Sequence, residues 1–183
     1  MLNHLRRLNL KETEIALNKF AKKVVEDARR NLKVQGLYAT GKLSKALGYK
    51  FKRSKNSFQF DFTPGYAAYV DKGVSGVKQV RNNTPYSYKD KKPPISAFDK
   101  WVLKRFPSET RDESGRFIDR RSMKFALQTH IYNYGIKQSL FFTKPFKKHF
   151  NQLESDVIEA FKIDLNRFYK GSFINQQNKE RNG

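Results

Sequence analysis

The side chains that most often carry catalysis or bind metal ions are few in this sequence, and they are scattered. Its histidines are His4, His130 and His149, and none has another histidine or a carboxylate nearby at the spacing of metal ligands. Cysteine is absent, which excludes a disulfide framework, a thiolate zinc site, an iron–sulfur cluster and a cysteine nucleophile. The histidines therefore predict no metal site, and we expect them to be structural.

Paired carboxylates, which can hold Mg²⁺ or transfer protons, occur at two places. Asp112 and Glu113 fall in a polar stretch expected to be an exposed loop. Glu154 and Asp156 lie two residues apart on an expected helix, where they point away from each other. The glycine-rich phosphate loop, the dinucleotide fingerprint and the nucleophile elbow are absent. We therefore predict no catalytic residue, no cofactor, no metal and no enzymatic activity, and a nuclease that uses Asp112 and Glu113 is the least favoured alternative.

Hydrophobic periodicity predicts two long amphipathic helices, one near each end of the chain. The first spans residues 9–34, with Asn9 and Glu12 in the positions of a capping box and Gly36 just beyond its end. The second begins at Pro145, because proline favours the first helical position. Its predicted apolar stripe consists of Phe146, Phe150, Leu153, Val157, Phe161, Leu165 and Phe168, and its acidic residues are Glu154, Asp156, Glu159 and Asp164.

Between these helices the pattern changes to the alternation that is typical of β-strands. Residues 49–53 and 58–62 alternate aromatic and polar side chains on either side of a turn, which predicts a β-hairpin with its aromatic face toward the core. Shorter helices are predicted at 41–47, 95–106 and 118–134, with a long irregular loop at 73–94. Residues 1–170 thus predict a single α+β domain, in which the first helix packs on a small antiparallel sheet and a long helix closes the chain. Residues 171–183 are expected to form a flexible C-terminal tail.

The chain is strongly basic, with 38 Lys and Arg against 17 Asp and Glu among 183 residues and a net charge of +21. Such a charge attracts polyanions, and nucleic acid is the most obvious partner. The charge is spread along the chain, however, with +10 over residues 1–63, +5 over 64–117 and +6 over 118–183. No zinc finger, helix-turn-helix or ribonucleoprotein motif accompanies it. Apolar runs long enough to span a membrane are absent, and the start of the chain lacks a secretory signal pattern, so we expect no membrane association.

Four segments, in this order, resemble the tail-completion and head–tail joining proteins of tailed bacteriophages. Residues 38–47 contain Thr-Gly-Lys-Leu and are similar to the "TGxLxxSI" signature of that family. Residues 66–75 resemble its "YAxYVxxGT" segment, and residues 93–102 resemble its proline-led helix that ends in Trp-Val. Residues 131–136 with Phe141 and Phe142 resemble its "IxxxGIxxxxFF" close. The resemblance covers about residues 20–165.

The resemblance implies a structural virion protein that forms a homo-oligomeric ring in the neck or upper tail, assembles in the host bacterial cytoplasm, and carries no catalytic residues. Its partners would be portal-bound adaptors, other connector or tail proteins, and the genomic DNA that passes through the channel without being read. A free, non-specific nucleic-acid-binding protein is the alternative. Candidate interface residues are Thr40, Gly41, Leu43, Gly73, Tyr86, Tyr88, Glu154, Asp156 and Glu159. Candidate residues facing the DNA channel or another polyanion are Lys50, Lys52, Arg53, Lys89, Lys91 and Lys92.

For several of these residues two interpretations stay open. Tyr86 and Tyr88 suit an interface loop, but packing onto their own domain is an equally good expectation. Gly73 and Gly76 are expected to free the following loop to lie against a neighbour. The acidic face of residues 154–164 is a plausible partner for a basic helix face of another subunit.

Overall fold

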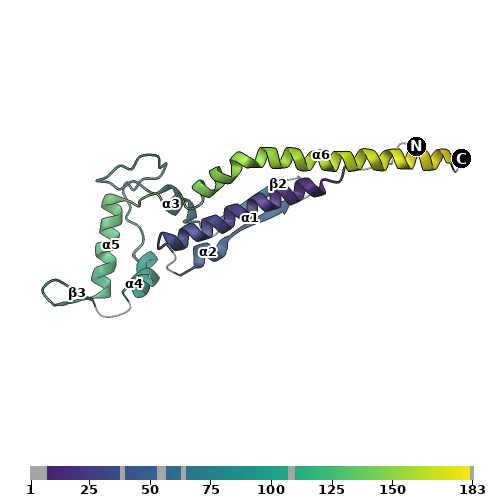
Figure 1. Cartoon of the computed structure of the whole chain (residues 1–183). Coiled ribbons are helices and arrows are strands. Elements are labelled where there is room, and N and C mark those ends of the chain that lie inside the picture. The colour runs from purple at the N-terminus through teal and green to yellow at the C-terminus, as the bar shows by residue number, and fades with distance from the viewer. Residues whose placement is uncertain (1–7, 38–39, 53–56, 63–64, 107–109, 182–183) are drawn as a thin grey trace.

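A computed structural model of the chain describes residues 8–37, 40–52, 57–62, 65–106 and 110–181. The molecule is elongated, with an antiparallel pair of long helices at one end and a group of short elements at the other (Figure 1). The fold is α+β, as predicted. Its helices are α1 (Lys11–Val34), α2 (Lys42–Ala46), α3 (Ala67–Lys72), η2 (Ile95–Phe98), α4 (Asp99–Arg105), α5 (Arg120–Tyr134) and α6 (Thr143–Arg181), and its strands are β1 (Leu47–Lys52), β2 (Ser57–Phe62), β3 (Thr110–Arg111) and β4 (Phe117–Ile118).

The first helix confirms the predicted periodicity, since its buried residues include Phe20, Val24, Ala28 and Leu32. The predicted capping box is wrong: α1 begins after Leu10, and no side chain at that position caps it. The predicted stop at Gly36 is confirmed. Gly36 has a φ of 66°, and the amide of the following residue donates to the carbonyl of Leu32, which closes the helix in a Schellman motif.

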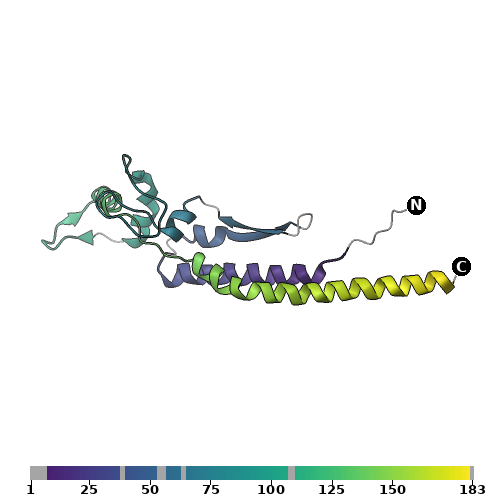
Figure 2. The same cartoon turned by 90° about the horizontal axis from the view of Figure 1, so that it is seen from above.

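Strands β1 and β2 form the predicted antiparallel hairpin, which runs alongside the α1–α6 pair (Figure 2). Tyr49 pairs with Phe60, and both side chains pack against the main core. The aromatic face is therefore confirmed for these two residues, and the side chains of Phe58 and Phe62 lie outside the described part. The core beneath the hairpin consists of Val25, Ala28, Leu32, Leu43, Leu47, Ala67 and Phe141.

The last helix differs from its predicted bounds at both ends. It begins at Thr143, so Pro145 is its third residue, another position where the missing N–H costs no helical hydrogen bond. At the other end the backbone stays helical through Gly171 to Arg181, where the sequence predicted a flexible tail. None of the helices in the described ranges is both apolar and long enough to cross a membrane.

The short elements at the other end pack around α5. Helix α5 begins two residues later than predicted, and the side chain of its N-cap Asp119 accepts a hydrogen bond from the Arg121 amide. Gly135, with a φ of 71°, ends it as predicted. The stretch expected to be an exposed loop carries a two-residue β-hairpin, β3–β4.

Candidate functional site

Two buried carboxylates carry out structural work rather than chemistry. Asp164, on α6, is 2% exposed and receives three hydrogen bonds from the start of α1. Its donors are the Glu12 amide at 3.0 Å and the amide and hydroxyl of Thr13, each at 2.9 Å. Burial alone would raise the pKa of Asp164, but these hydrogen bonds and the nearby charge of Arg167 lower the pKa below its ordinary value. Asp164 therefore caps α1 from another helix, and it leaves the acidic face that was expected to meet a neighbour.

Asp71 plays the same part at the start of α6. Its carboxylate accepts hydrogen bonds from the Phe142 amide at 2.9 Å and the Thr143 amide at 3.2 Å, and also from the Thr143 hydroxyl. A carboxylate at a helix N-terminus satisfies amides that have no helical partner and interacts favourably with the helix dipole. The two most buried aspartates are thus used as caps. The described residues hold no group of three His, Asp or Glu side chains suited to a metal ion.

A third polar group joins α1 to α6 at the opposite end of the helix pair. His149 Nε2 lies 2.9 Å from Asp27 Oδ2, and Lys148 Nζ lies 3.6 Å from the same oxygen. Arg30 pairs with the other carboxylate oxygen. Burial would raise the pKa of Asp27, but the His149 hydrogen bond and the charges of Arg30 and Lys148 lower it. Sequence reasoning missed this contact because the two residues are 122 positions apart.

The 73–94 loop is tied to its own chain. The Val74 and Ile136 amides exchange hydrogen bonds with each other's carbonyls, at 2.9 and 2.8 Å. A Cβ on Gly76 would lie 2.2 Å from the Asn133 carbonyl oxygen, and one on Gly73 would lie 2.7 Å from the Ile136 carbonyl oxygen. These glycines therefore let the loop backbone approach the end of α5, which corrects the expectation that they free it.

The two loop tyrosines follow the interpretation in which they pack onto their own domain. Tyr86 lies edge-on to Tyr69, with ring centroids 4.5 Å apart, and Tyr88 lies 6.2 Å from Tyr132. Both are half-buried, and burial, with a contribution from Tyr69, raises the pKa of Tyr88. Their role in an interface stays a prediction that rests on their remaining exposed surface.

The Thr-Gly-x-Leu segment supplies little surface to a neighbour. Leu43 is 6% exposed and belongs to the chain's own core, so its expected role as an interface residue needs correction. Gly41 is buried with a φ of 70°, which lets the chain turn tightly into α2. Thr40 is exposed, and its hydroxyl accepts a hydrogen bond from the Lys42 amide at 3.3 Å.

The predicted polyanion-facing residues lie on two separate elements. Lys50 and Lys52 are exposed on the hairpin, and Arg53 lies outside the described residues. Lys89, Lys91 and Lys92 are exposed on the loop that packs against α5, away from the hairpin in both views (Figures 1 and 2). The described lysines therefore form no single basic patch within one chain.

The most distinctive surface is one that the sequence did not separate from the core, and we call it the α6 stripe: Phe150, Glu154, Ile158, Phe161, Leu165 and Tyr169. These residues recur every three or four positions, so they share one side of the helix. Phe150 is 53%, Ile158 47%, Phe161 40% and Tyr169 53% exposed. Ala160 and Asp164, the two buried residues of this region, lie on the neighbouring side that faces α1. The single predicted stripe therefore divides into one side against α1 and one side exposed.

No family model matches the chain, and no curated protein or solved structure matches it either.

The geometry fits binding between macromolecules better than chemistry. Of the predicted interface acids, Glu154 and Glu159 are exposed and Asp156 is half-buried, so all three stay near the α6 stripe. A helix that is apolar on two sides is typical of one that packs between two partners. The described chain supplies the first of these partners, α1.

Proposed function

We propose that this chain is a structural virion protein that forms a homo-oligomeric ring in the neck or upper tail of a tailed bacteriophage. In this role it joins portal-bound adaptors to the tail around the DNA channel, after assembly in the bacterial cytoplasm. The proposal rests on the α6 stripe, because large apolar side chains along an exposed helix suit a second protein surface. The four motif resemblances in order supply the choice of virion and neck.

The charge supports the same role. A ring around a channel repeats each subunit's charge by its copy number, and backbone phosphates need no base-specific contacts. Separate basic surfaces on the hairpin and the loop suit a non-specific contact of this kind. Free, non-specific binding to nucleic acid is the second candidate, and the net charge of +21 is what favours it.

Light scattering coupled to size-exclusion chromatography tests the proposal. We expect the pure protein to form a species several times the 21.5 kDa of one chain, with ring-shaped particles in electron micrographs. The double variant Ile158→Ser/Phe161→Ser should shift the protein to monomer. The control Val34→Ser/Val80→Ser removes two valines that are 80% and 83% exposed elsewhere, and it should assemble like wild type.

Two results would count against the ring. One is a chain that stays monomeric at every concentration and also fails to associate with the virion connector or to appear at the virion neck. The other is tight binding to duplex DNA by a monomer near physiological salt, with an affinity that falls steeply as salt rises. The second result favours the free nucleic-acid-binding protein.

A further inference from the structure

The end of the molecule built from η2, α4, β3, β4 and α5, which we call the α4–α5 end, carries a second exposed apolar surface. Phe117 is 57%, Leu103 50%, Phe125 47% and Trp101 39% exposed. Two of these rings lie beside guanidinium groups: Arg111 is 3.6 Å from the ring centroid of Phe117, and Arg121 is 5.8 Å from that of Phe125. Exposed aromatic residues with arginine are the composition enriched at protein–protein interfaces.

This end is also basic. Its described residues from 99 to 125 include eight Lys and Arg but four Asp and Glu. Three of the acids are engaged within the chain. Asp99 pairs with Lys124 at 2.7 Å, Asp119 caps α5, and Asp112 accepts hydrogen bonds from two amides of its own turn. The surface offered to a partner therefore carries an excess of positive charge.

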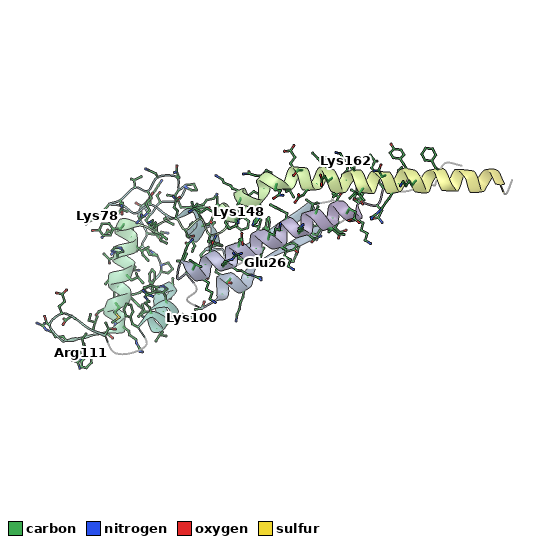
Figure 3. All side chains as sticks on the ribbon, viewed as in Figure 1. Glu26, Lys78, Lys100, Arg111, Lys148 and Lys162 are labelled. Atoms are coloured by element: carbon green, nitrogen blue, oxygen red, sulfur yellow. The ribbon has the colours of Figure 1, made fainter. Side chains whose placement is uncertain are left out.

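The α6 stripe has the opposite character. Residues 150–165 carry Glu154, Asp156, Glu159 and Asp164 against a single base, Lys162, in a chain whose net charge is +21. With Asp164 buried as a cap, Glu154 and Glu159 stay exposed beside Ile158. Figure 3 shows Lys100 and Arg111 at the α4–α5 end and Lys162 far from them on α6. The two surfaces thus lie at different ends of one chain, and a copy cannot close this contact on itself.

We propose that the α6 stripe of one copy packs against the α4–α5 end of the next copy. Apolar side chains meet apolar side chains, while Glu154 and Glu159 face the excess of Lys and Arg. Because two different patches of the same chain meet, the contact is heterologous, which is the kind that repeats around a ring. This inference rests on the proposed function and deepens it by naming the two surfaces.

The available area suits such a contact. An interface of standard size buries about 800 Å² on each partner. Large apolar side chains bury roughly 150–250 Å² when covered, so the four exposed side chains of the α6 stripe, each about half covered already, supply about 400 Å². The polar residues beside them, including both glutamates, are needed for the rest, so we expect their charges to lie inside the contact.

Reversing the charge on each surface tests the pairing. The first variant is Glu154→Lys/Glu159→Lys, and the second is Lys104→Glu/Arg105→Glu on the exposed side of α4. Each variant alone places like charges against each other, so we expect association at least about tenfold weaker than wild type. In an equimolar mixture every contact is again between opposite charges. We expect the mixture to recover association to within about threefold of wild type, which also shows that both variants are folded.

The control Lys72→Glu/Lys78→Glu makes the same change in net charge as the second variant, at exposed lysines away from both surfaces. It should associate like wild type. If the second variant alone assembles normally while the first does not, α6 pairs with another surface and the inference is wrong. A mixture that fails to recover also overturns it. A wild-type chain that is itself monomeric removes the proposed ring and this contact together, so the two failures are distinguishable.

Discussion

Asp164 provides the sharpest test of how the helix pair is built. The change Asp164→Ala removes the acceptor for two amides and one hydroxyl at the start of α1, and these groups are part-buried or buried. Loss of a helix cap costs about 1 kcal/mol, and a hydrogen bond to a charged group contributes about 1.5–3 kcal/mol. Since these contributions overlap, we expect the free energy of unfolding to fall by about 3 kcal/mol.

Urea unfolding followed by circular dichroism measures this loss, and thermal unfolding should show a melting temperature lower by roughly 6–12 °C for a chain of this length. The matched control is Asp156→Ala, on the same helix, half-buried and with no such role, which should change stability by less than about 0.5 kcal/mol. Asp164→Asn should fall between the two, because its amide oxygen still accepts a hydrogen bond while the charge is lost.

The pH dependence follows from the same contacts. The pKa of Asp164 lies below its ordinary value of 3.8 in the folded chain, so its contribution is complete above the unfolded pKa and is lost as pH falls through the folded pKa. The stability difference between wild type and Asp164→Ala should therefore shrink below about pH 4. A difference under 0.5 kcal/mol at pH 7, or one that does not change in acid, would refute the cap as the source of stability.

Two further predictions concern other parts of the fold. Gly135→Ala places a Cβ 2.0 Å from the Val74 carbonyl oxygen at a φ of 71°, so we expect at least about 3 kcal/mol of destabilisation in urea unfolding. Gly115→Ala has a similar φ of 76° with open space around it, and a loss near 1 kcal/mol there would separate the clash from the backbone strain; equal losses would contradict the close approach. Asp27→Asn should cost about 1–2 kcal/mol at pH 7. Because the pKa of Asp27 is lowered, this cost should fade as pH drops below its ordinary value of 3.8, and an unchanged difference in acid would argue against the pairing with His149.

Patterns within a single element were sufficient to predict most of the secondary structure. The three-and-four spacing in α1 marked its buried residues, and the alternation around Tyr49 and Phe60 marked the inward face of the hairpin. Both signals are local, because burial repeats with the geometry of the element itself. The start of α1 was predicted less well, since its cap comes from a residue 151 positions later and no local pattern announces it.

The limits are similar on α6. A stripe that is about 100° wide and one that is nearly twice as wide look alike in a periodic sequence, so the exposed side merged with the side that packs on α1. Asp164 was counted as surface charge because acidic residues are rarely fully buried without partners, and its partners were out of local reach. The two-residue strands of β3 and β4 are too short to alternate, so only tertiary structure reveals them.

The two polar contacts between α1 and α6 fix the sliding of one helix along the other. Thr13 and Asp27 are 14 residues apart on α1, and their partners Asp164 and His149 are 15 residues apart on α6. At 1.5 Å per residue these spans are about 21 and 22 Å, so both contacts form in one antiparallel register, and a slip by one turn loses both together. Because the register is fixed, the length of α6 that continues past its contacts with Glu12 is fixed as well. Residues 168–181 amount to about 21 Å of helix beyond the end of the pair. Isolated helices of that length are marginal in water, so a partner for this side of the molecule has a structural reason to exist.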